Sequence, residues 1–114
     1  MTENAIKFLE DKKKHALEQA QVLVADNRTD EGILLKIRAN VFGIFEDLAK
    51  GGHDAERLLA KIPLAWEKSL EQAIAHDDHI KIAQEKFKLD AIVEIRAFLE
   101  REEKYRGQGH YQNF

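Results

Sequence analysis

The residue run most suggestive of chemistry is His76-Asp77-Asp78-His79. Histidines three residues apart can share one face of a helix, and the carboxylates beside them could complete a site for zinc or iron. The run falls between two helical patterns, however, where Asp77 or Asp78 can accept the first backbone N–H groups of the next helix. His76 suits the carboxyl end of the preceding helix dipole. We therefore interpret the run as a structural turn and expect no metal site.

Di-iron carboxylate bundles require Glu-x-x-His motifs on two helices. None of the five histidines follows that pattern, because the residues three positions before them are Lys12, Lys50, Ala73, His76 and Gly107. The chain also has no cysteine, which excludes thiolate zinc sites and cysteine nucleophiles. We expect no catalytic residue and no cofactor, and therefore a protein that is not an enzyme.

Two other features keep a ligand-binding or enzymatic role open. Lys13 lies in the middle of an apolar helix face, where a buried amine can do base or covalent chemistry, although lysine usually extends its charge to water or pairs with a carboxylate. Aromatic residues at helical spacing could line a ligand cavity, but they more often belong to a core. These aromatic residues are Phe45, Trp66, Phe87 and Phe98. A small-ligand or metal-binding bundle with a regulatory or enzymatic role is thus the alternative hypothesis.

Nucleic-acid binding is disfavoured by the charge pattern. The net charge is −3, from 18 basic and 21 acidic residues. The basic run Lys12-Lys13-Lys14-His15 is interleaved with acidic neighbours, and so is the start of the tail over residues 104–114. That tail combines positive charge, glycines and aromatic residues, which can stack on bases, but the nearby charges almost cancel. The expected helices are also longer than those of a helix-turn-helix.

Length and composition indicate one domain over residues 1–114 in a reducing compartment. The amino-terminal residues lack the basic-then-apolar pattern of a signal peptide. The longest apolar stretch, residues 41–45, falls far short of the roughly 18 residues that a membrane span needs. We expect a soluble, cytoplasmic protein with no membrane contact.

The apolar spacing predicts four amphipathic helices in an all-α, antiparallel up-down bundle. The first spans about residues 3–25, and its inward positions are Ala5, Ile6, Leu9, Ala16, Ala20 and Leu23. Thr29 or Asp30 can cap the second, which Gly51-Gly52 ends. The inward positions of the second helix are Ile33, Leu34, Ile37, Val41, Ile44, Phe45 and Leu48.

The third helix follows Asp54 as its cap, and its apolar register continues through Pro63. Its inward positions are Ala55, Leu58, Leu59, Ile62, Trp66, Leu70, Ala73 and Ile74. Because proline lacks an N–H group and crowds the carbonyl of Leu59, we expect a kink or a break near Pro63. The fourth helix follows the His76–His79 run and should reach about Lys104. Its inward positions are Ile80, Ala83, Phe87, Ala91, Ile95 and Phe98.

A second apolar stripe runs along two of these helices. In the fourth, Ile82, Leu89 and Val93 lie within about 40° of one another, nearly opposite the inward face. In the second, Leu35, Phe42 and Ala49 lie to one side of the inward face. Such stripes invite another helix. Three explanations remain open, namely an irregular bundle or tail that covers them, a homodimer, and a different helical partner.

We therefore predict a non-enzymatic protein–protein interaction module that presents a helical surface as a homodimer. The tail over residues 105–114 is expected to be ordered and to dock on Leu35 and Phe42 of the same or a neighbouring chain. The predicted interface residues are Leu35, Phe42, Ile82, Leu89, Val93, Tyr111 and Phe114.

Overall fold

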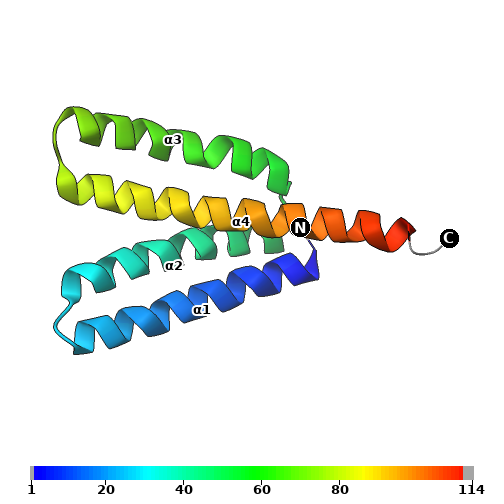
Figure 1. Cartoon of the computed structure of the whole chain (residues 1–114), viewed down its shortest axis with the longest axis horizontal. Coiled ribbons are helices and arrows are strands. Elements are labelled where there is room, and N and C mark those ends of the chain that lie inside the picture. The colour runs from blue at the N-terminus through cyan, green and yellow to red at the C-terminus, as the bar shows by residue number, and fades with distance from the viewer. Residues whose placement is uncertain (1, 112–114) are drawn as a thin grey trace.

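The computed structural model describes residues 2–111, and the side chains of residues 2–104. Within that range the chain forms four helices and no strand: α1 (Glu3–Ala25), α2 (Thr29–Lys50), α3 (Ala55–Ala75) and α4 (His79–Tyr111). Consecutive helices run in opposite directions (Figure 1). The all-α, antiparallel up-down arrangement predicted from the sequence is therefore confirmed.

Each of the three turns contains one residue with positive φ, namely Asn27 at 60°, Gly52 at 81° and Asp77 at 56°. Asparagine, aspartate and glycine tolerate this left-handed conformation better than other residues do. The N–H of the following residue then bonds to a carbonyl five positions earlier. These bonds join Arg28 to Leu23 at 2.8 Å, His53 to Leu48 at 3.1 Å and Asp78 to Ala73 at 2.9 Å. The motif satisfies the last carbonyls of each helix and reverses the chain within a few residues.

Side chains cap the start of three helices. Thr2 accepts from the Ala5 N–H at 3.2 Å, Asp54 from Glu56 at 3.0 Å, and Asp78 from Lys81 at 3.1 Å. The Asp54 and Asp78 caps were predicted. The predicted cap of α2 by Thr29 or Asp30 is wrong, because α2 begins directly after the tight turn, with Arg28 at its cap and no side-chain cap bond.

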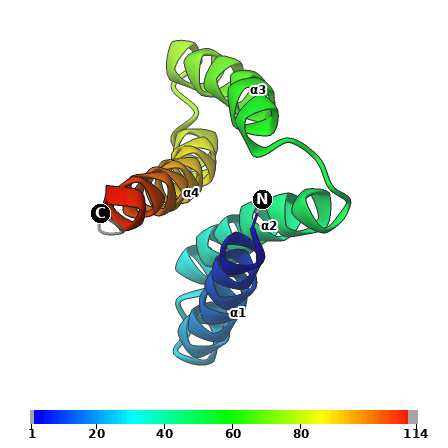
Figure 2. The ribbon, with the colours of Figure 1, turned by 90° about the vertical axis from the view of Figure 1, so that its right-hand side faces the viewer.

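The helices pack as two hairpins joined through α2 and α4. α1 packs on α2, α3 packs on α4, and α2 packs on α4, whereas α1 and α4 touch only slightly. Within the described residues, α2 and α3 make hardly any contact although they are consecutive. The end view shows α3 standing away from α2, with the connecting loop between them (Figure 2). The bundle is therefore open on one side of α2.

The core lies where α2 and α4 meet. Its buried apolar residues are Leu9, Val41, Phe42, Phe45, Ala49, Leu59, Ala91, Ile92 and Ile95. The inward positions predicted for α1 are confirmed, because Ala5, Leu9, Ala16 and Ala20 are buried. Ile80 is a failed prediction, since it is 74% exposed in the first turn of α4, and Ile74, near the end of α3, is exposed as well.

Pro63 lies inside α3, which continues without a break from Ala55 to Ala75. The predicted break is therefore wrong, whereas a bend at this position stays a prediction. Pro63 has no N–H group to donate to the carbonyl of Leu59, four residues earlier. The guanidinium of Arg96, on α4, donates to that carbonyl at 2.7 Å instead. A side chain of the neighbouring helix thus replaces the missing backbone bond.

α4 continues to Tyr111 and does not end near Lys104 as predicted. The predicted end lies just before Gly107 and Gly109. A glycine within a helix costs only about 1 kcal/mol relative to alanine, which is not enough by itself to end one.

Candidate protein interface

Phe42 does not belong to the surface. Its side chain is 0% exposed and belongs to the core, so its prediction as an interface residue is wrong. The ring packs edge-on to Phe8, with centroids 6.4 Å apart, and the Arg38 guanidinium lies 5.1 Å from its centroid. The tail cannot dock on a side chain that the core covers.

Small residues explain why α2 turns its Phe42 side inward and not the side that the sequence predicted. Gly32, Ala39 and Gly43 lie within about 40° of one another, on the side of α2 that faces α1, and let α1 approach closely. A Cβ on Gly32 would lie 2.7 Å from Cγ2 of Val24, and one on Gly43 would lie 3.3 Å from Cδ of Lys13. Large residues on the opposite face cannot offer α1 such contact, so that face turns outward.

The outward face of α2 carries four large apolar residues, which we call the α2 stripe: Ile33, Ile37, Ile44 and Leu48. At 100° per residue they lie within about 60° of one another. Ile33 is 42% exposed and Ile44 41%, and the other two are half-buried. The prediction that Ile33 and Ile44 point inward is therefore wrong. α2 therefore carries an outward apolar stripe as predicted, but it contains Ile33 and Ile44, whereas Phe42 and Ala49 are buried.

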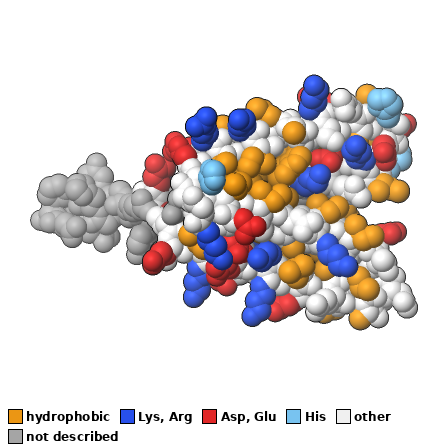
Figure 3. Space-filling view, turned by 180° about the vertical axis from the view of Figure 1, so that it is seen from behind, with side chains coloured by type: hydrophobic (Ala, Val, Ile, Leu, Met, Phe, Trp, Pro, Cys, Tyr) orange, Lys and Arg blue, Asp and Glu red, His pale blue; other side chains and the backbone are white. Residues whose placement is uncertain are grey.

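α1 widens this apolar surface at Ile44. A shallow groove between α1 and α2 is lined by Lys13, Leu17, Ala39, Asn40, Gly43, Ile44 and Asp47. Leu17 is 41% exposed there. In the view from behind, hydrophobic side chains gather across the middle of the molecule, between α3 at the top and the α1–α2 hairpin below (Figure 3).

The other predicted interface residues are placed unevenly. Leu35 is half-buried beside Val22 in a groove of the α1–α2 hairpin. On α4, Ile82 and Leu89 are half-buried, and Val93 is 60% exposed. They were predicted to form an interface together with Phe42, but Phe42 is buried and cannot contribute to one. The side chain of Tyr111 and all of Phe114 lie outside the described residues.

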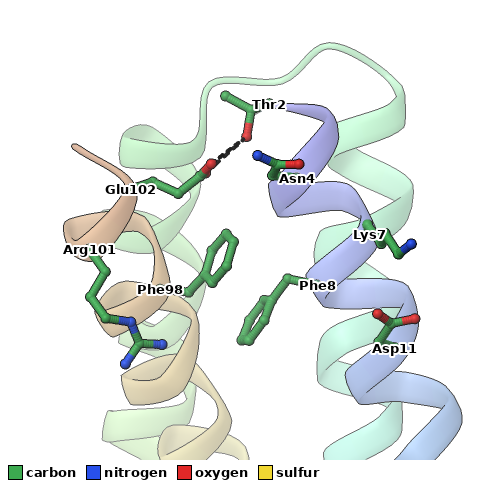
Figure 4. Close-up of a pocket in the computed structure, with 8 residues that line it drawn as sticks. All are labelled: Thr2, Asn4, Lys7, Phe8, Asp11, Phe98, Arg101 and Glu102. Carbon is green, nitrogen blue, oxygen red and sulfur yellow. Dashed lines mark hydrogen bonds between the residues drawn. The ribbon is translucent and has the colours of Figure 1, made fainter. Parts of the chain in front are cut away.

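A second groove lies between the start of α1 and α4 (Figure 4). The rings of Phe8 and Phe98 stack in it with centroids 4.2 Å apart. The Thr2 hydroxyl, at the cap of α1, donates to the Glu102 carboxylate, with oxygens 2.9 Å and 3.1 Å away. The remaining lining residues are Asn4, Lys7, Asp11 and Arg101. These contacts fasten α1 to α4, where the two helices otherwise touch little.

Lys13 pairs with a carboxylate, as the pattern of α1 suggested. Its Nζ lies 2.9 Å from Oε1 of Glu46, whose side chain is 6% exposed. Lys50 lies 3.0 Å from the other Glu46 oxygen and 3.0 Å from Glu10. The hydrogen bond from Lys13, with help from Lys50, holds the pKa of Glu46 below its ordinary value although burial acts to raise it. Each oxygen of Glu46 thus lies beside a lysine, and the cluster joins α1 to α2. This pairing favours a structural role over catalysis.

The histidine run is a turn. Asp78 caps α4, and the ring Nδ1 of His76 donates to the Gln72 carbonyl at 2.7 Å, at the end of α3. Within the described residues, no group of three or more histidine, cysteine, aspartate or glutamate side chains is arranged to hold a metal ion.

The aromatic residues serve the core. Phe45 is fully buried, and Trp66 packs against the core with the Lys88 ammonium 5.7 Å from its ring centroid. The interpretation of these residues as core is confirmed for both.

Comparison with known proteins adds no further identification. No family model matches the chain, and neither a curated protein nor a solved structure matches it. Among the described helices, none is long and apolar enough to span a membrane.

Proposed function

We propose that the protein is a non-enzymatic interaction module that acts as a homodimer through the apolar surface of α2. The observation that carries this proposal is the α2 stripe, a row of large apolar residues on the outward side of α2, two of them exposed and two half-buried. Ile33, at one end of the row, lines a shallow groove with residues of the first two turns of α4. A single exposed apolar residue needs no explanation, whereas a row at helical spacing is typical of a surface that meets another helix.

A second copy is the partner that this surface favours. Two-fold homodimers are the commonest oligomers, and their interfaces use the same patch on both subunits. The α2 stripe with Leu17 supplies such a patch, bordered by the exposed charged residues Lys36 and Asp47. Val93 on α4 is exposed, but it lies nearly opposite the buried Ala91 and Ile95 and is left out of the proposed interface.

Light scattering coupled to size exclusion, over a range of protein concentrations, tests the proposal. We expect the mass of a dimer for the natural chain and of a monomer for Ile44→Glu, with helical circular dichroism unchanged. Leu64→Glu is the matched control, because Leu64 is 59% exposed on α3, away from the α2 stripe. It should stay dimeric. A natural chain that is monomeric at every concentration would contradict the proposal.

A further inference from the structure

We infer that two copies pair through their α2 stripes in an antiparallel arrangement, about a two-fold axis that passes near Asn40 and Val41. This inference rests on the proposed homodimer and specifies its geometry. It follows from the order of apolar and charged residues along the exposed side of α2.

The α2 stripe is symmetric about its own centre. The midpoint between Ile33 and Leu48 is the peptide bond between Asn40 and Val41, and Ile37 and Ile44 have the same midpoint. An antiparallel pairing centred there sets Ile33 against the partner's Leu48. It also sets Ile37 against the partner's Ile44. Large apolar residues then meet large apolar residues along the whole row, in a single register.

Charges along one edge of the stripe favour the same pairing. Lys36, Asn40 and Asp47 lie within about 40° of one another, on the side of the stripe nearest α1. A two-fold axis perpendicular to both helices places this edge against the same edge of the partner. With a rise of 1.5 Å per residue, Lys36 and the partner's Asp47 are offset by only about 3 Å along the helix axis. The pairing therefore brings opposite charges together twice.

Both charged groups are free for this role. Lys36 and Asp47 are exposed, and among the described side chains neither lies within 4.0 Å of an opposite charge. Of the other charged residues on α2, Glu31, Arg38, Glu46 and Lys50 each have an oppositely charged partner. A parallel pairing would set the charged edge against the opposite, apolar edge, which carries Leu34 and Val41, and would leave the charges unmatched.

Asn40 belongs to the charged edge of the α2 stripe, near its centre. It lies next to the proposed axis and is exposed in the single chain. A polar residue at one position of a helix pair favours the alignment that gives it a polar partner. Its place near the centre of the stripe favours the alignment that the charges also favour.

Cysteine cross-linking tests the geometry directly, because the chain has no natural cysteine. We expect Asn40→Cys to form a disulfide-linked dimer under mild oxidation, since this position of both copies lies near the axis. A mixture of Lys36→Cys and Asp47→Cys proteins should give mainly the mixed dimer. Glu67→Cys, exposed on α3, is the control and should stay uncross-linked. All four positions are on the surface, so circular dichroism should be unchanged.

Charge reversal gives a second, independent readout. Lys36→Asp should weaken dimerisation about tenfold or more, because it faces like charges across the axis at two places. Asp47→Lys should do the same. Combining the two substitutions restores opposite charges with their signs exchanged, and should return the dimer affinity to within about threefold of the natural chain.

The outcomes separate this inference from the proposal beneath it. If the natural chain dimerises but Asn40→Cys does not cross-link, or the double charge reversal does not restore the affinity, the antiparallel pairing is overturned and the homodimer stands. Preferred cross-linking of Lys36→Cys with itself would overturn it too, because it indicates a parallel pairing. A natural chain that is monomeric throughout would overturn both.

Discussion

Arg96 donates from its guanidinium to the backbone carbonyl of Leu59 at 2.7 Å, the one carbonyl in α3 that Pro63 leaves without its helical donor. The proline is tolerated in the middle of a helix because the neighbouring helix supplies the missing hydrogen bond. The same contact joins α3 to α4. Among the described residues, α4 is the only helix against which α3 packs substantially. The two residues lie 37 positions apart in the sequence, so no local pattern predicts this hydrogen bond.

Arg96→Met should lower the free energy of unfolding by about 1–2 kcal/mol, because it removes a charged donor from a partly buried carbonyl while keeping an aliphatic stem. In a Pro63→Ala background the restored N–H group satisfies the Leu59 carbonyl, and the same substitution should cost less. Urea unfolding of the four proteins in this double-mutant cycle measures the coupling, which we expect at about 1 kcal/mol.

The exposed Lys86 on α4 provides the control, since Lys86→Met should change stability by less than about 0.5 kcal/mol. Strictly additive effects of Arg96→Met and Pro63→Ala would show that the proline and the arginine act independently, against the structural argument.

Glu46→Gln should lower the free energy of unfolding by about 1–3 kcal/mol at neutral pH, because it removes a buried charge that two lysines stabilise. The pKa of Glu46 is lowered in the folded chain from an ordinary value of 4.5. Its contribution to stability is therefore present above about pH 4.5 and is lost as the pH falls through the lower folded-state pKa. The difference between the natural chain and Glu46→Gln should shrink in acid.

Urea unfolding at several pH values between neutral and acidic conditions measures this change. Glu18→Gln, at an exposed position of α1, should differ little from the natural chain at any pH. A Glu46→Gln deficit that stayed constant into acid would mean that packing, and not the charge, is what the glutamate contributes.

The directions of all four helices and most of their bounds were predictable from the sequence, but the end of α4 and the face that α2 turns inward were not. Both sides of α2 carry large apolar residues at helical spacing, so periodicity alone cannot choose between Phe42 and Ile44. The choice is made by Gly32, Ala39 and Gly43, which allow close approach of α1. Their recurrence along one side of α2 was visible in the sequence and would have indicated the buried face.

The caps illustrate the same limit. Asp54 and Asp78 were identified because each directly precedes an apolar pattern, and both accept a backbone N–H group. α2 has no such cap, because its preceding turn is closed by backbone bonds of Asn27 and Arg28. The Arg96–Leu59 bond and the stack of Phe8 on Phe98 depend on how α4 sits against its neighbours, which no local pattern encodes.

Gly32→Ala should destabilise the chain by about 1–3 kcal/mol, although alanine is the better helix former. The added Cβ would lie 2.7 Å from Cγ2 of Val24 and 3.2 Å from the Ala20 carbonyl oxygen, so α1 and α2 must move apart. Removing the first of these contacts with Val24→Ala should recover part of the loss. Thermal unfolding, followed by circular dichroism, measures both proteins.

Gly43→Ala is the matched glycine substitution on the same helix. Its Cβ would lie 3.3 Å from Cδ of Lys13, a flexible side chain that can yield, so we expect no loss and a gain of up to about 1 kcal/mol from helix propensity. Equal effects of the two substitutions would contradict the close approach of α1 at Gly32.

Phe8 and Phe98 stack with their planes at 11°, and this is the main apolar contact between the start of α1 and α4. Phe98→Ala should cost about 2 kcal/mol, less than a fully buried phenylalanine because the ring is half-buried. Phe8→Ala should cost more, since the same ring also packs edge-on to Phe42 in the core. In a double-mutant cycle the coupling should be about 0.5–1.5 kcal/mol, the range for aromatic pairs.

Hydrogen exchange offers a local test, because losing the stack should speed exchange in the first turns of α1 while leaving the α1–α2 turn unchanged. Uniform acceleration along the whole of α1 would mean that the stack supports the entire hairpin and not only its end.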